Sequence, residues 1–166
     1  DPDITPHPDY TNLVDDALLA IPTISLVTDL DNLFGVANGI YVNANREGDA
    51  WERVTSVELL NPDGSKGFQE NAGLRIRGGA SRGDNNPKHA FRLRFRRAYG
   101  APRLEYKMFG PDGADSFNGV DLRCAQTPSL NFHQPSQNTH VRDIFSRDLQ
   151  LACGHPSTRG DHYHLY

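Results

Sequence analysis

The chain has 166 residues, which is enough for one domain with a substantial core, and its formal net charge is −4. This acidic balance argues against nucleic-acid binding as the main role, because proteins with that role usually carry an excess of basic residues. No apolar run approaches the roughly 18 residues that a membrane-spanning helix needs. Plentiful glycine and proline favour a loop-rich, strand-dominated fold.

The chain begins with a segment unlike the rest. Residues 1–21 are rich in proline and polar side chains, so we expect an arm or linker before a domain over residues 22–166. Within that domain, residues 23–28 ("TISLVT") predict a strand, and residues 29–35 ("DLDNLFG") predict one helical turn closed by a glycine. Residues 39–44 ("GIYVNA") predict another strand.

The next segments predict hairpins. Residues 51–60 alternate loosely and end in "NPDGSKG", whose Asn-Pro and Asp-Gly pairs are typical of turns. The clearest period of two follows in residues 74–77 and 91–96. It places apolar side chains on one face and arginines on the other, with Leu74, Ile76, Phe91, Leu93 and Phe95 opposing Arg75, Arg77, Arg92, Arg94 and Arg96.

Residues 104–110, 119–125 and 162–166 predict shorter strands, and residues 139–152 predict a helix with Asn138 as its cap and Gly154 at its end. The apolar stripe of this helix consists of Val141, Ile144, Phe145, Leu149 and Ala152. Helical geometry places Asp148 near the middle of that stripe and Asp143 on the wet side. We therefore predict an α+β fold, a twisted antiparallel sheet with one main helix.

The loop between the arginine strands, "GGASRGDNNPK", suggests an anion site. Its glycines let backbone amides approach a ligand, Ser81 adds a hydroxyl, and Arg82 and Lys88 add charge, so phosphate is the natural partner. An inward Asp148 could hold Lys88 or an arginine in place. The alternative is an arginine face that is merely exposed and partly neutralised by acids elsewhere in the chain.

Two segments together resemble a known family. "GLRIRGGASRGDNNPKHAFRLRF", followed by "HVRDIFSRDLQLACGHPSTRGDHYHLY", is similar to the N-terminal half of the spore-coat-protein-H (CotH) kinases, with their R-I-R-G-x-S and P-K-K segments. The resemblance covers most of residues 73–166. It implies the N-terminal lobe of an atypical protein kinase, which uses ATP and a divalent metal such as magnesium to phosphorylate Ser in a protein substrate, at the cell surface or outside the cell.

The family pattern also suggests site residues. Lys88 matches the first lysine of the P-K-K segment, Arg77 and Ser81 match the R-G-x-S part, and His89 replaces the second lysine. With Arg82 and Asp148, these residues are our candidates for binding the nucleotide. Catalytic and metal-binding acids follow later in the family, so the resemblance implies that the domain continues beyond residue 166 into a C-terminal lobe, without which the chain is inactive.

Other patterns leave alternatives open. An exposed cluster of aromatic side chains would suit a non-catalytic adhesion or carbohydrate-binding module, the candidates being Tyr41, Trp51, Tyr99 and Tyr106. A zinc site can be sketched from His155, Asp161, His162 and His164, although surface histidines are the preferred interpretation. Cys124 and Cys153 are expected to be two buried thiols or, outside the cytosol, one disulfide.

Overall fold

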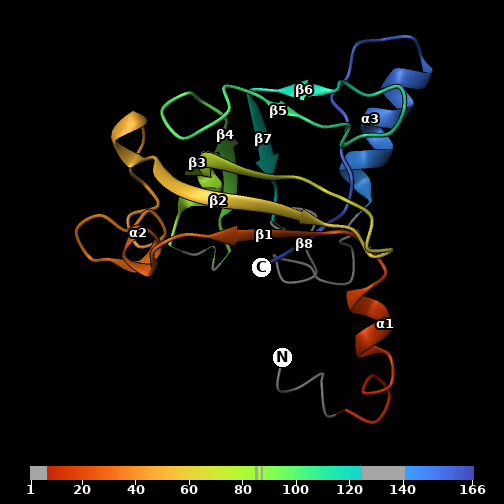
Figure 1. The fold of residues 1–166 in the computed structure, drawn as a ribbon, viewed down its shortest axis with the longest axis horizontal. Helices are drawn as coiled ribbons and strands as arrows, with labels where there is room; N and C mark the ends of the chain where they lie inside the picture. The colour runs from red at the N-terminus through yellow and green to blue at the C-terminus, as the bar shows by residue number, and fades with distance from the viewer. Residues whose placement is uncertain (1–6, 85, 87, 125–140) are drawn as a thin grey trace.

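The computed structural model describes residues 7–84, 86, 88–124 and 141–166. Its main feature is a six-stranded sheet, antiparallel except for the parallel pair β1 and β8. Across the sheet, the order is β7 (Gly119–Leu122), β4 (Ala90–Arg94), β3 (Gln69–Arg77), β2 (Arg53–Leu60), β1 (Thr23–Val27) and β8 (His164–Leu165). The sheet twists so strongly that β4 and β7 run steeply across the direction of β1 (Figure 1). The predicted α+β class and largely antiparallel sheet are confirmed.

Short elements surround the sheet. In the described part of the chain they are α1 (Val14–Leu18), α2 (Leu30–Phe34), η1 (Asp49–Trp51), η2 (Ala80–Arg82), β5 (Leu104–Glu105), β6 (Ser116–Phe117) and α3 (Arg142–Ala152). The strands β5 and β6 pair only with each other, and β6 was not predicted. The longest helix, α3, is the predicted main helix, and Gly154 follows it with a φ of 78°. Its predicted cap, Asn138, lies outside the described residues.

The hairpin of β2 and β3 forms as the turn residues predict. The carboxylate of Asp63 accepts a hydrogen bond of 2.9 Å from the backbone N–H of Ser65, and Gly64 adopts a φ of 71°, which other residues rarely tolerate. This turn fixes a register in which Arg53 lies opposite Leu74 and Glu58 lies opposite Gln69. The register determines which side chains share each face of the sheet.

One face of the sheet carries the core. Leu74 of β3 lies opposite Leu93 of β4, and both are almost fully buried. The buried apolar residues around them are Ile24, Ile40, Ala44, Val57, Leu59, Ala72, Ile76, Phe95, Leu104 and Met108. The alternation predicted for the two arginine strands is therefore confirmed, and the arginines lie on the face opposite this core.

The strand predicted over residues 39–44 is wrong, because this segment folds back onto α2 as a series of turns. The backbone N–H of Ile40 donates to the carbonyl of Asn32 at 2.9 Å, and that of Tyr41 donates to the carbonyl of Leu33 at 2.9 Å. These bonds use groups that a strand would offer to a neighbour. The segment still buries Ile40, so its apolar residues serve the core without a sheet pairing.

The segment expected to be an arm, residues 1–21, contains a short helix, α1, that the sequence did not indicate. Helix α1 lies beyond the edge of the sheet formed by β8, away from the other strands (Figure 1). The ring Nε2 of His164 donates to the carbonyl of Ala17 at 2.9 Å and attaches α1 to that edge. Among the described helices, none has the length and apolar composition needed to cross a membrane.

Candidate functional site

An arginine cluster occupies the polar face of the hairpin formed by β3 and β4. Arg75 lies directly opposite Arg92 in the register, and Arg77 and Arg94 continue the two rows. Arg96 follows just beyond β4. Like charges at directly opposite positions destabilise a sheet, so this face needs anions close by.

Three acids supply negative charge, and each contacts two arginines. Asp49 and Glu52 both contact Arg75 and Arg96, and Asp121 contacts Arg77 and Arg92. Hydrogen bonds from Arg96 and then Arg75 lower the pKa of Asp49. Burial raises the pKa of Asp121, but hydrogen bonds from Arg92 and Arg77 outweigh this effect and the pKa lies below 3.8. Asp49 and Asp121 are therefore ionised at neutral pH.

Glu52 is the most buried of these acids, because its side chain is only 1% exposed. It lies over Gly73 of β3, where a Cβ atom would come within 2.5 Å of the carboxyl group. Any larger residue at position 73 would displace the Glu52 side chain. Gly73 lies two residues before Arg75 on β3, and its missing side chain leaves room for the ion pair of Glu52 with Arg75.

Arg82, predicted to add charge to a phosphate site, holds the backbone of two loops together. Its guanidinium donates to the carbonyls of Gly78 at 2.5 Å, Ile76 at 2.6 Å, Ala44 at 2.8 Å and Arg46 at 3.1 Å. It also lies 3.3 Å from a carboxylate oxygen of Glu47. Because these acceptors use most of its five N–H donors, Arg82 positions the loop around residues 44–47 beside β3.

Ser81, another predicted site residue, also has a local role. Gly78 adopts a φ of 111°, and a Cβ atom there would lie 1.9 Å from the hydroxyl oxygen of Ser81. The backbone carbonyl of Ser81 accepts a hydrogen bond of 3.0 Å from the ring Nδ1 of His89. The segment from Arg77 to Ser81 is thus explained by close packing of a tight turn, which needs no ligand.

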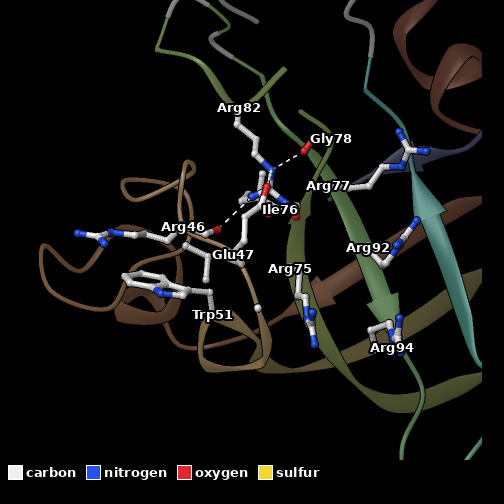
Figure 2. A pocket seen from close by; sticks show the side chains of 12 residues that line it. Arg46, Glu47, Trp51, Arg75, Ile76, Arg77, Gly78, Arg82, Arg92 and Arg94 are labelled. Atoms are coloured by element: carbon white, nitrogen blue, oxygen red, sulfur yellow. Dashed lines mark hydrogen bonds and ion pairs between the residues drawn. The ribbon is translucent and has the colours of Figure 1, made fainter. Parts of the chain in front are cut away.

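Beside this turn, a hollow of about 370 Å³ opens over the arginine face. Its polar lining is formed by Arg46, Glu47, Arg75, Arg77, Arg82, Arg92 and Arg94. In Figure 2, Arg77 and Arg92 extend toward β7, while Arg46 and Trp51 lie on the loop across from them. Its volume lies within the range of about 300 to 1,000 Å³ that is usual for small-molecule sites.

The hollow carries an excess of positive charge. The six arginines that line the hollow, together with the neighbouring Arg96, contact four acids, which are Glu47, Asp49, Glu52 and Asp121. Among the described residues, these seven cations face four anions, which leaves three positive charges unbalanced. In addition, the Nε atom of Arg94 is buried and has no hydrogen-bond partner among the described residues. Such a donor is costly unless an acceptor reaches it.

The predicted pairing of Lys88 with an inward Asp148 is wrong. Asp148 is exposed on α3, and Asp143, predicted on the wet side, is half-buried and contacts both Arg123 and Arg147. Of the predicted apolar stripe, Ile144 lines the cleft between the helix and the sheet, together with Asp143 and Arg147. Phe145, a member of that stripe, is 66% exposed.

Lys88 itself is exposed and lines a second, larger cleft between the sheet and α3. Arg77, Arg92 and Arg94 line this cleft as well as the hollow, so they form a wall between the two.

Cys124 also lines the cleft, and burial raises the pKa of its thiol, which argues against a reactive thiolate. Both cysteines are free, and Cys153 is exposed rather than buried.

The aromatic residues considered for carbohydrate binding do not form one surface. Tyr41 contacts His89, Tyr106 contacts Phe68, and Trp51 lies beneath the guanidinium groups of Arg46 and Arg53. Each of these aromatic side chains is partly buried among its own neighbours. The structure therefore offers no planar cluster of these residues for stacking a sugar.

No group of three potential metal ligands occurs in the part of the chain that the structure describes. The acids nearest the hollow are already paired with arginines, so these residues do not fit a magnesium ion.

The chain matches no protein-family model, and no curated protein or solved structure was found to be similar to it. The chemistry of the arginine hollow is thus the main guide to function.

Sequence reasoning placed Arg77 and Arg82 at the hollow but missed several of its residues. Arg92 and Arg94 were assigned to the arginine face without a role, although their alternation was the available signal. Arg46 was not singled out, and Trp51 was considered only for sugar binding. Arg46 lies on the loop whose backbone Arg82 holds, a contact between residues far apart in the sequence, and Trp51 lies at the end of η1.

Proposed function

We propose that the arginine hollow binds the phosphate groups of a nucleotide, and that the chain is the phosphate-binding part of an atypical, CotH-like protein kinase. The observation that carries the proposal is the excess of three positive charges around one hollow. Planar guanidinium groups bind phosphate through paired, charge-assisted hydrogen bonds, which makes phosphate the anion that best suits them.

Three arginines supply the direct contacts in this proposal. Arg77, Arg92 and Arg94 line the hollow, and Arg94 offers the buried Nε atom that lacks a partner among the described residues. Ser81 and Arg82 act indirectly, because their hydrogen bonds fix the turn and the loop around residues 44–47. Lys88 contacts a phosphate only if the ligand extends into the neighbouring cleft.

The kinase part of the proposal rests on the family resemblance. ATP is the phosphate donor, a Ser of a protein substrate is the acceptor, and the protein acts outside the cell or at its surface. The same resemblance assigns magnesium and the catalytic groups to a C-terminal lobe of the parent protein. We therefore expect this chain to bind nucleotide without transferring phosphate.

Titration with ATP in the absence of magnesium tests the proposal. Trp51 is the single tryptophan of the chain and lines the hollow, so its fluorescence reports binding at this place, and calorimetry gives the affinity. Replacing Arg94→Met keeps the apolar stem and removes the charge, and we expect ATP to bind about tenfold more weakly or worse. Lys66→Met is the matched control, because Lys66 is exposed in the turn at the other end of β3.

The outcomes separate the possible sites. An equal loss of ATP affinity in Arg94→Met and Lys66→Met would indicate a general charge effect and would contradict a specific site. A loss of ATP affinity in Lys88→Met but not in Arg94→Met would indicate that the phosphates bind in the larger cleft. A chain that ignores ATP but binds glycans or a cell-surface protein would instead favour the adhesion or carbohydrate-binding module.

A further inference from the structure

Asp121 holds the two arginines that are best placed to bind a phosphate. It lies on β7 directly opposite Arg92 of β4, whose Nε and Nη2 atoms donate to its two oxygens at 2.5 and 2.9 Å. From β3, the Nε atom of Arg77 donates to the same carboxylate at 2.7 Å. One carboxylate therefore serves two guanidinium groups, and the arrangement keeps one net positive charge.

The arginine pair is still accessible from outside. The side chain of Arg77 is 38% exposed and that of Arg92 is 42% exposed, and both line the hollow. Arg94 lies two residues along β4 and adds the buried Nε donor. A ligand anion that enters here thus meets three cations, one of which has no acid in contact among the described residues.

We propose, on the basis of the proposed function, that the hollow selects dianionic phosphate monoesters and that Asp121 is an internal competitor which excludes monoanions. A monoanionic ligand that displaces Asp121 from Arg77 and Arg92 replaces one negative charge by another and gains little. A dianionic phosphoryl group brings one more negative charge and three oxygens, enough for both arginines and Arg94. The terminal phosphate of ATP is a group of this kind.

The two nucleotides AMP and cyclic AMP provide the test, because AMP ends in a phosphate monoester and cyclic AMP is a monoanionic diester of the same base and sugar. At pH 7.5 the monoester is mainly dianionic, since its second pKa is about 6. We expect the wild-type chain to bind AMP about tenfold more tightly than cyclic AMP or better. In Asp121→Asn the freed arginines accept either anion, so cyclic AMP binds more tightly and the preference shrinks.

Asp143→Asn is the matched control. Asp143 lines the larger cleft, as Asp121 does, and also contacts two arginines, but these are Arg123 and Arg147, which do not line the hollow. Its loss should leave the preference for AMP unchanged. A similar change in both variants would overturn the inference, because it would show an effect of overall charge.

Two further outcomes keep the inference testable. Equal affinity of the wild-type chain for AMP and cyclic AMP would refute it even if Asp121→Asn fails to fold. An Asp121→Asn variant that folds, as its thermal unfolding shows, and keeps the wild-type preference would also refute it. Failure of the proposed function looks different, because the wild-type chain then binds no nucleotide at all.

Discussion

Replacing Glu52 by glutamine tests whether the arginine face depends on a buried counterion. The carboxylate of Glu52 is almost completely buried and contacts Arg75, whose side chain is 20% exposed. The second acid at Arg75 is Asp49, which is 77% exposed. The chain thus offers a buried and an exposed partner of the same arginine, which makes their contributions separable.

The expected cost follows from burial. Removing one partner of a buried ion pair typically costs about 3 to 5 kcal/mol, because the other charge is left without compensation. Glutamine can still accept one hydrogen bond from Arg75, so we expect the lower end, about 3 kcal/mol. With a urea m-value of about 2 kcal/mol/M, this cost lowers the unfolding midpoint by about 1.5 M.

Urea unfolding at pH 7, followed by circular dichroism, measures this shift. Asp49→Asn is the control, and we expect less than half the shift, since solvent screens an exposed pair. If Asp49→Asn shifts the midpoint as far as Glu52→Gln, burial is not what makes the pair important. A changed m-value in either variant would indicate an altered unfolded or native state, which the argument from burial does not predict.

Three further predictions follow. Gly78→Ala should cost about 2 kcal/mol in thermal unfolding because of its positive φ and the nearby Ser81 hydroxyl, whereas Gly79→Ala, with open space around it, should be nearly neutral. The pKa of Asp121 is lowered, so the stability gap between wild type and Asp121→Asn should be constant above about pH 5 and shrink below about pH 4 in urea titrations. Phe145→Ser, at an exposed position, should leave the melting temperature unchanged.

The two-residue period predicted the arginine hairpin correctly because strand geometry is local. Alternation alone places Leu74 in the core and Arg75 on the opposite face, and the turn chemistry of residues 61–67 fixes the first hairpin. Segment 39–44 shows the limit of the same reasoning. Its β-prone residues fold back onto α2, where they donate to backbone carbonyls that the end of the helix leaves open.

The orientation of α3 was predicted wrongly. The prediction assumed that the apolar stripe of the helix faces the sheet. In the structure, the ion pairs of Asp143 with Arg123 and Arg147 lie on the side toward the cleft, and Phe145 is exposed. Periodicity reports which residues share a helix face, but it carries no information on which cations lie opposite. Asp148, predicted to hold Lys88, was assigned on that assumption alone.

Asp121 shows the same limit within the sheet. Its neighbours Val120 and Leu122 are apolar, so alternation places Asp121 on the face opposite the core, where the arginines lie. Its partner Arg92 is 29 residues away in sequence, and only the pairing of β4 with β7 brings the two together. An acid on the arginine face was therefore predictable from the sequence, but its position between Arg77 and Arg92 was not. In the proposed site, that position makes Asp121 the competitor of an incoming anion, so selectivity between anions, more than affinity alone, is the decisive measurement.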